Sequence, residues 1–502
     1  MSNEDEGTLS PAWKALQDHQ RAVKSLKIAD LFKDDMARAQ SFSAVHEGVS
    51  LDFSKNKITE HTLSLLCNLA RERRLAEKRE QLFGGYLVNT TEKRPALHMA
   101  LRGSCAPLLE IGGKNVKQDV DASLARLKEF TQKIRAERKI TQIVNIGIGG
   151  SDFGPFMVCK ALRHLADPMI ENFFISNIDP AHLAYYLDKI DPQKALFIVA
   201  SKSFTTQETA TNAASIKNWL EEKHGITDIS QNFCAVTNNI AAAREFGIAE
   251  NMVFSMPSWV GGRFSLWSAL GLSIALSVGF ENFEALLAGA NSADTHFLNT
   301  PFERNIPLLM ALIGIWYRNF WDYRSYGILP YSQTLSQLPQ YIEQLDMESN
   351  GKSTDINGEK LPYQTAPVIL GGVGSNAQHS FFQLLHQGSD IIPCDFIACK
   401  NPVYNIGDHH QKLLANVLGQ TQALMNGQSN AQEPHRHFEG NRPSNILWLE
   451  KLTPYNLGML LAFYEHKIFT QGAIWNINSF DQFGVELGKE LAQKALKKMQ
   501  GV

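Results

Sequence analysis

The sequence predicts an α/β protein with two doubly wound parallel sheets and additional helices at both ends of the chain. The main evidence is three short apolar runs, each followed by a turn rich in glycine, serine or threonine and then by a helical pattern. These runs are Ile143–Ile148, Ala195–Ala200 and Pro367–Leu370. The order of strand, turn and helix is typical of parallel sheets, which bind ligands at the carboxyl ends of their strands.

The length of the chain indicates more than one such unit. A chain of 502 residues exceeds what one hydrophobic core normally holds. Two of the apolar runs lie in one stretch and the third lies well beyond it. We therefore expect a mainly helical N-terminal segment over residues 1–115 that packs on the larger domain, a first, small α/β domain over residues 116–285, and a second, large α/β domain over residues 286–502 that includes C-terminal helices.

Composition excludes several classes of function. Hydrophobic residues make up 44% and charged residues 20% of the chain, with a net charge of -3, so there is no basic surface for nucleic acid or for a membrane. The six cysteines are scattered without a CxxC pair, which is typical of reduced thiols. The acidic N-terminus does not resemble a signal peptide. We expect a cytoplasmic protein in which the runs Leu266–Phe280 and Ile306–Trp321 are buried helices, not membrane spans.

Two turns of the first domain have the composition of a phosphate-binding site. Unpaired N–H groups at a helix N-terminus, hydroxyl donors and a nearby positive charge all favour a phosphate. Alternatively, the hydroxyls only cap helices, and for either turn alone the two interpretations are equally good. Two such turns in one domain favour the phosphate site. Its predicted residues are Gly150, Ser151, Ser201, Lys202, Ser203, Thr205 and Thr206.

Better-known ligand motifs are absent from the sequence. Asp152 occupies the position of the third glycine of a dinucleotide-binding motif. The segment Asn350–Ser353 ends like a P-loop but lacks the earlier glycine and a preceding strand. Two histidine pairs, at 409–410 and 435–437, lack the spacing and the acidic or cysteine partners of a metal site. We expect neither a dinucleotide nor a metal ion.

A carboxylate and an imidazole stand beside glycine turns in the second domain. Glu348 precedes Gly351, which is expected to cap its helix, and His379 follows Gly374. These two side chains are the groups most often used to move protons near neutral pH. Each of them, taken alone, is more often structural than catalytic.

Two cations have less certain surroundings in the sequence. Arg263 follows a glycine pair, where a ligand can approach the backbone, so a role in stabilising an oxyanion and a structural ion pair are equally good interpretations. Lys489 lies in the apolar stripe of a predicted helix and shares that face with Gln482. A lysine on an inward face needs an anion or a function, and the alternative is a lysine at the edge of the stripe whose amine reaches solvent. The apolar stripe consists of Val485, Ala492 and Leu496.

Together these segments resemble the phosphoglucose isomerase family from about residue 50 to the C-terminus. The resemblance implies two sugar-isomerase-type domains and a reversible isomerisation of glucose 6-phosphate to fructose 6-phosphate, in glycolysis and gluconeogenesis. It implies ring opening and base-catalysed proton transfer through a cis-enediol(ate), without a cofactor or a metal. The matching segments are Gly147–Pro155, Ser201–Ala213, Trp259–Ser268, Leu345–Lys352, Gln378–Gly388, Phe438–Pro443 and Gln471–Lys489.

The resemblance also implies roles for individual residues. Glu348 matches the base that moves a proton between carbons 2 and 1, while His379 and Lys489 match the groups that assist ring opening. Arg263 matches the residue that stabilises the enediolate. The two phosphate turns match the sugar-phosphate contacts, with Gln344 and Gln482 completing the site. A homodimer is implied, in which the histidine comes from the neighbouring subunit.

Some positions depart from the family pattern, and two other functions remain open. Gly371–Ala377 differs from the turn usual before the histidine, Ser258 replaces a common aspartate, and Ser203 replaces a common threonine. A non-catalytic sugar-phosphate-binding regulator on the same fold would keep the hydroxyl-rich turn but would not need Glu348 together with the two cations. An isomerase that also accepts mannose 6-phosphate is a further alternative, although members of that family are shorter.

Overall fold

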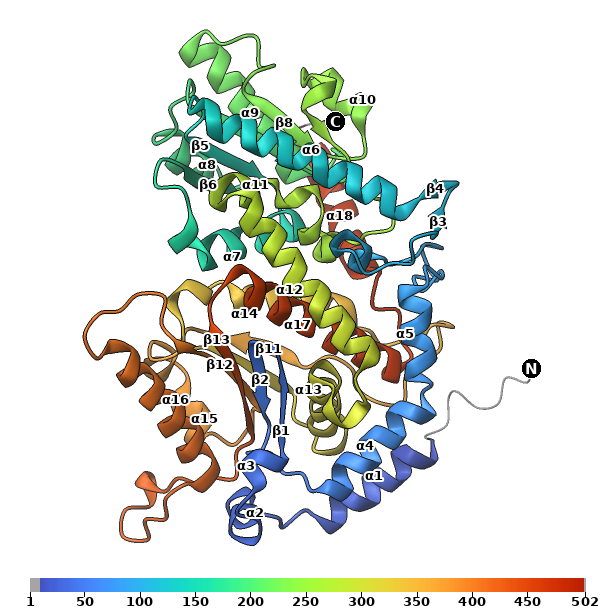
Figure 1. The fold of residues 1–502 in the computed structure, drawn as a ribbon, viewed down its shortest axis with the longest axis vertical. Coiled ribbons are helices and arrows are strands. Elements are labelled where there is room, and N and C mark those ends of the chain that lie inside the picture. The colour runs from blue at the N-terminus through green and yellow to red at the C-terminus, as the bar shows by residue number, and fades with distance from the viewer. Residues whose placement is uncertain (1–9, 501–502) are drawn as a thin grey trace.

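The computed structural model describes residues 10–500. Figure 1 shows two α/β units, one above the other, with long helices between them. The upper unit contains a five-stranded sheet and the lower unit a six-stranded sheet. The predicted fold class, with two parallel sheets covered by helices, is confirmed.

The first sheet is parallel throughout and has the order β6-β5-β7-β8-β9. Alternate residues of its central strand pack into different cores. Leu196 and Ile198 belong to the main core, whereas Phe197 and Val199 pack under α9. Both faces are therefore buried, which explains the continuous apolar runs in the sequence. The strands are β5 (Gln142–Ile146), β6 (Glu171–Ile175), β7 (Ala195–Ala200), β8 (Phe233–Val236) and β9 (Val253–Phe254), and the helices are α6 (Val116–Glu137), α7 (Phe153–Ala161), α8 (Pro180–Leu187), α9 (Gln207–His224), α10 (Ile240–Phe246) and α11 (Leu272–Val278).

The second sheet has the order β1-β2-β13-β12-β10-β11 and is parallel except at one edge. That edge is an antiparallel hairpin from the N-terminal segment, paired through Leu51 with Leu447 of β13. The sequence analysis did not predict this hairpin, because strands of four residues carry too little periodicity to be recognised. The strands are β1 (Ser43–His46), β2 (Val49–Asp52), β10 (Ser325–Pro330), β11 (Val368–Gly371), β12 (Cys394–Asn401) and β13 (Ser444–Lys451).

Long buried helices pack against the second sheet. Every side chain of α13 (Ile306–Ile315) is buried, and so are nearly all those of α17 (Pro454–Trp475). The apolar run Leu266–Phe280, which contains α11, is buried throughout, and the run Ile306–Trp321 is buried except at Arg318, Asn319 and Trp321. No helix within residues 10–500 is long and apolar enough to cross a membrane. The remaining elements are α1 (Pro11–Ala22), α2 (Ile28–Asp34), α3 (Arg38–Ser41), α4 (Glu60–Glu72), α5 (Leu75–Phe83), β3 (Glu110–Ile111), β4 (Lys114–Asn115), α12 (Phe280–Asn299), α14 (Leu338–Glu343), α15 (Phe382–Gln387), α16 (His409–Asn426) and α18 (Glu486–Met499).

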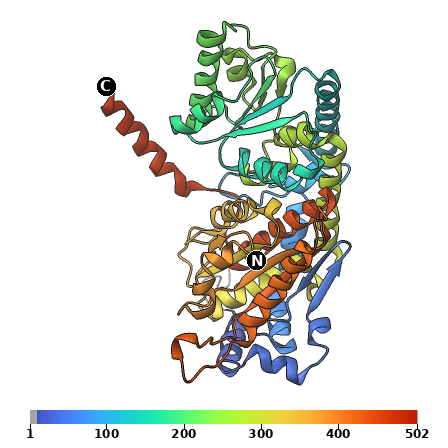
Figure 2. The same ribbon diagram turned by 90° about the vertical axis from the view of Figure 1, so that its left-hand side faces the viewer.

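The C-terminal helix α18 is set apart from the rest of the chain. Figure 2 shows it projecting from the region between the two units. None of its side chains is buried. The apolar stripe predicted to face inward is exposed, with Val485 at 45% and Leu496 at 41%. The prediction of an inward face is therefore wrong for a single chain, because periodicity identifies an apolar face but not what covers it.

Candidate active site

Glu348 lies at the end of a π-helical turn. The helix α14 continues beyond Glu343 as a π turn over Gln344–Glu348, a local distortion often found at functional sites. The Gln344 Nε2 donates a hydrogen bond of 3.0 Å to the Glu348 Oε2. The Glu348 side chain is 25% exposed, so its carboxylate is oriented by a neighbour and still open to a ligand. The helix then ends before Gly351, as predicted, where a Cβ atom would overlap the Met347 carbonyl oxygen.

A buried arginine lies beside this carboxylate. The Arg263 Nη1 is 3.7 Å from the Glu348 Oε2. All three guanidinium nitrogens also donate hydrogen bonds, which fix the plane of the group. Burial lowers the pKa of Arg263, while the charges of Glu348 and Asp481 oppose that shift. The acceptors are the Ser349 Oγ at 2.7 Å, the Gln482 Oε1 at 3.0 Å, and the carbonyl oxygens of Ser479 and Asp481 at 2.7 and 3.1 Å.

The first predicted phosphate turn packs directly against these residues. It follows β5 as a short 3-10 segment, Gly149–Ser151. A Cβ atom on Gly150 would overlap the Gly262 carbonyl oxygen and approach the Arg263 backbone nitrogen at 2.7 Å. Gly149 has a φ of +60°, and a Cβ atom there would lie 3.2 Å from the Gln344 Nε2. The turn, Arg263 and Gln344 therefore form one site.

The hydroxyls of the second predicted phosphate turn do not cap the helix that follows it. Thr206 occupies the N-cap position of α9, but its side chain accepts no capping hydrogen bond. Instead its hydroxyl pairs with that of Ser201 at 3.2 Å, and the Thr205 hydroxyl donates to the Ser203 Oγ at 2.8 Å. Ser151 does not cap a helix either, because Asp152 holds the N-cap position of α7. The capping interpretation therefore does not describe these hydroxyls.

The sequence analysis assigned Lys202 only to the phosphate site, but its amine also binds two carbonyl oxygens of a distant loop. Its Nζ donates hydrogen bonds to the carbonyl oxygens of Ser258, at 3.0 Å, and Val260, at 2.9 Å. Burial, with a contribution from the Arg94 charge, lowers the pKa of Lys202 to about 8. The lysine thus ties the second turn to the loop that leads to Arg263.

Two predicted catalytic residues lie away from Glu348. Lys489 is exposed on α18, and His379 is exposed at the end of a 3-10 turn, Ala377–His379. Within residues 10–500, neither side chain makes a hydrogen bond or ion pair with Glu348. The structure brings together Glu348, Arg263, Gln344, Gln482 and the first phosphate turn, but not these two groups.

The structure also reveals a residue that the sequence analysis missed. The Lys352 Nζ lies 3.0 Å from the Asp481 Oδ1 and donates to the Glu348 carbonyl oxygen at 3.2 Å. It thereby fastens the helix end that carries Glu348 to the segment that holds Arg263. Lys352 stands inside the segment Leu345–Lys352 that carries the family resemblance, but only the structure shows where its side chain points.

The assembled residues suit proton transfer on a phosphorylated substrate. A partly exposed carboxylate can act as a base, and the buried guanidinium can stabilise negative charge that develops beside it. The glycine and hydroxyl turns offer donors for a phosphate. Within residues 10–500 there is no group of three or more His, Cys, Asp or Glu side chains that could hold a metal ion.

Comparison with known proteins relates this geometry to a family. Residues 52–502 match the family model described as phosphoglucose isomerase. A glucose-6-phosphate isomerase of Chlorobium phaeobacteroides is 47% identical over 98% of this chain and 92% of its own length, and one of Methylococcus capsulatus is 46% identical over 98% and 95%. The crystal structure of a glucose-6-phosphate isomerase from Chlamydia trachomatis superposes with a TM-score of 0.91, at 35% identity, over 98% of this chain and 96% of that one. The chain belongs to the phosphoglucose isomerase family.

Proposed function

We propose that this protein interconverts glucose 6-phosphate and fructose 6-phosphate by proton transfer through a cis-enediol(ate), in glycolysis and gluconeogenesis. The observation that carries the proposal is the pairing of the Glu348 carboxylate with the buried Arg263 guanidinium, 3.7 Å apart, beside the turn at Gly150. Close relatives that bear the name of this activity support the choice of substrate.

In the proposed reaction, Glu348 removes the proton from carbon 2 of the open-chain sugar and returns it to carbon 1. A second proton moves from the oxygen on carbon 2 to the oxygen on carbon 1, so the substrate and product have the same atoms. The enediolate charge would face the guanidinium of Arg263, the buried cation beside Glu348. Ser151, Ser201, Ser203, Thr205 and Thr206 hold the phosphate, and Gln344 orients the base. A positioned base of this kind contributes on the order of 10²–10⁴-fold in rate.

Ring opening needs groups that Glu348 and Arg263 do not supply. We assign this step to His379 and Lys489, both exposed in the single chain. The exposure of His379 supports a homodimer in which this histidine completes the site of the neighbouring subunit. Lys489 would reach the site when α18 packs against the residues around Glu348, with the chain bending between Gln482 and α18.

The test compares the wild type with Glu348→Gln and with the matched control Glu343→Gln, which lies at the end of α14. Conversion of fructose 6-phosphate to glucose 6-phosphate is followed in the presence of a chelator. We expect the wild type and Glu343→Gln to be active and Glu348→Gln to lose roughly a hundredfold or more in kcat. A fully active Glu348→Gln variant would assign the base to another residue. A wild type that binds the sugar phosphate without converting it would support the regulator.

A further inference from the structure

The two sheets of this protein share a strand order that marks two equivalent positions for a ligand. The first sheet contains the parallel strands β6-β5-β7-β8, and the second contains the parallel strands β11-β10-β12-β13. In both rows the strand that comes first in the sequence, β5 or β10, occupies the second position. In such sheets the second strand lies on one side of the first strand and the third strand lies on its other side. Ligands bind where the strand order reverses in this way, at the carboxyl ends of the first and third strands. In the first sheet this pair is β5 and β7, and the two predicted phosphate turns follow these strands.

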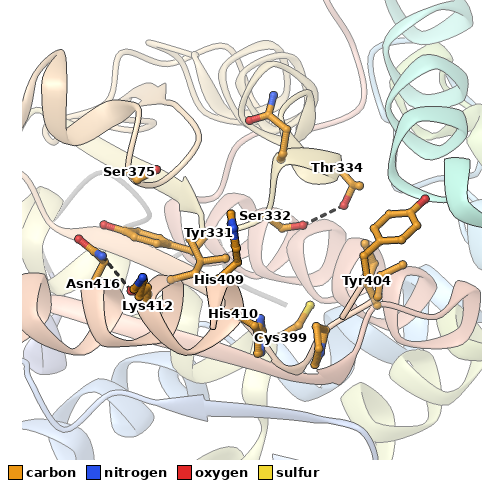
Figure 3. A pocket seen from close by; sticks show the side chains of 15 residues that line it. Tyr331, Ser332, Thr334, Ser375, Cys399, Tyr404, His409, His410, Lys412 and Asn416 are labelled. Carbon is orange, nitrogen blue, oxygen red and sulfur yellow. Dashed lines mark hydrogen bonds between the residues drawn. The ribbon is translucent and has the colours of Figure 1, made fainter. Parts of the chain in front are cut away.

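The corresponding position in the second sheet holds a cavity of about 540 Å³. This volume lies within the range of about 300 to 1,000 Å³ that is usual for small-molecule sites. The cavity is lined from the carboxyl ends of all four parallel strands and from the first turns of α16. Figure 3 shows the side chains that line it. It shares no lining residue with the site around Glu348. The residues that follow the strands are Tyr331 and Ser332 after β10, Ser375 after β11, Pro402 after β12 and Leu452 after β13.

A hydroxyl pair in this cavity repeats a feature of the second phosphate turn. The Ser332 Oγ and the Thr334 Oγ1 lie 2.8 Å apart, directly after β10. In the first unit, Ser203 and Thr205 make the same contact, two residues apart and also at 2.8 Å. Figure 3 shows the Ser332 and Thr334 side chains across the cavity from α16. Each unit therefore places a Ser-x-Thr hydroxyl pair at the carboxyl end of one of its two central strands, β7 in the first unit and β10, the counterpart of β5, in the second.

The basic side chains that line the cavity all come from α16. His409, His410 and Lys412 line it from α16, and none of the residues lining the cavity, all within residues 10–500, is Asp or Glu. The Lys412 Nζ is 2.9 Å from the Asp408 carboxylate outside the lining. Both partners of that pair are largely exposed, so the pair is weak and an incoming anion can compete for the lysine. The electrostatics favour an anionic ligand.

The rest of the lining is apolar. Val403, Leu413 and Leu452 form the wall between the strand ends and α16, and Tyr404, 61% exposed, stands at the rim. An exposed tyrosine ring offers a flat surface for stacking. The cavity thus combines an apolar wall with hydroxyl donors and a basic side.

We propose that this cavity is a second ligand site, which binds a phosphate monoester carrying a flat apolar group. The phosphate would lie beside the Ser332–Thr334 hydroxyls and His409, and the apolar group would lie against Val403 and Tyr404. Lys412 would add positive charge further along α16. The proposal does not depend on the isomerase activity, because it uses none of the residues of the site around Glu348.

Adenosine monophosphate is a suitable probe, with inorganic phosphate as its competitor. Binding is measured by titration calorimetry on the full chain with saturating glucose 6-phosphate, which occupies the first sheet's site. We expect one AMP per chain and displacement of AMP by millimolar inorganic phosphate. The double variant Lys412→Gln, His409→Gln should weaken AMP binding by about tenfold or more, since charge-assisted hydrogen bonds are the strong ones. Thr334→Val should weaken it by several-fold while keeping the shape of the side chain.

Lys133→Gln, an equal change of charge on an exposed lysine of α6, is the control and should leave the affinity unchanged. The isomerisation rate of each variant reports whether the chain is folded. The proposal is overturned if AMP does not bind, if glucose 6-phosphate displaces it, or if the cavity variants bind it like the wild type. Binding of AMP that inorganic phosphate does not compete with would also overturn it, because the phosphate would then not be recognised.

Discussion

Gly150 and Gly262 lie in backbone contact, so that a single methyl group on Gly150 would overlap the Gly262 carbonyl oxygen. Gly150 belongs to the turn after β5, and Gly262 immediately precedes Arg263. The contact joins the predicted phosphate turn to the segment that carries the buried guanidinium. In the proposed reaction, this contact would set the distance between the phosphate and the reacting carbons of the substrate.

Gly150→Ala should lower kcat/KM by about a hundredfold or more. The added Cβ meets backbone atoms and not a flexible side chain, so the turn or the Arg263 segment must shift, and a misplacement of about 1 Å can cost on the order of a hundredfold in rate. Steady-state kinetics of fructose 6-phosphate conversion measures the effect. The control is Gly419→Ala on α16, where a Cβ atom has no neighbour within 4 Å, and its kinetics should match the wild type. Near-normal activity of Gly150→Ala would show that the turn is free to move.

Arg263→Lys should lower kcat strongly although the charge is kept. Lysine has a single charged nitrogen and cannot reach the four acceptors that the guanidinium now satisfies. Each buried acceptor left without a donor costs about 1–3 kcal/mol, so we expect a lower melting temperature as well as a loss of about a hundredfold in kcat. Calorimetry and kinetics on the same sample separate the two effects. Arg94→Lys, on a nearby arginine that is 25% exposed, should change both quantities little, and equal losses in the two variants would contradict the role assigned to Arg263.

The sequence predicted two of the five strands of the first sheet, β5 and β7, because buried parallel strands are apolar on both faces. Ala195–Ala200 was identified with its observed bounds as β7, whereas the run Ile143–Ile148 extends two residues beyond the end of β5. The segments around Glu348 and Arg263 were identified because their motifs are long and specific. What the sequence could not predict depends on contacts between distant segments. No local sequence pattern predicts that the Lys202 side chain bonds to Val260, or that the chain forms a π turn over Gln344–Glu348.

Asp152→Asn should stabilise the protein at alkaline pH. Burial raises the pKa of Asp152 from 3.8 to about 7, opposed by a hydrogen bond with Ser176. The folded chain therefore keeps a proton that the unfolded chain releases between about pH 4 and pH 7, and stability falls as pH rises through that window. Asparagine does not titrate, so the variant escapes this loss. Relative to the wild type, it should gain about 2 kcal/mol between pH 5.5 and pH 8.5.

Urea unfolding at the two pH values measures this difference. Asp188→Asn, on an exposed aspartate at the end of α8, should show the same offset from the wild type at both. If Asp152→Asn also shows a constant offset, the Asp152 carboxyl does not titrate in this window in the folded chain.

Removal of α18 should abolish catalysis without unfolding the rest of the chain. No side chain of α18 is buried, so a chain ending at Val485 loses none of the core and should keep the melting temperature of the wild type within a few degrees. Its kcat should fall by about a hundredfold or more, because the proposed ring-opening group Lys489 is missing. Lys489→Met in the full chain should reproduce most of that loss, whereas Lys497→Met, on the same helix and also exposed, should not.

A substrate analogue locked in the open-chain form would distinguish ring opening from proton transfer, since its turnover should survive Lys489→Met. If the shortened chain converts cyclic fructose 6-phosphate at the normal rate, neither α18 nor Lys489 takes part in the reaction.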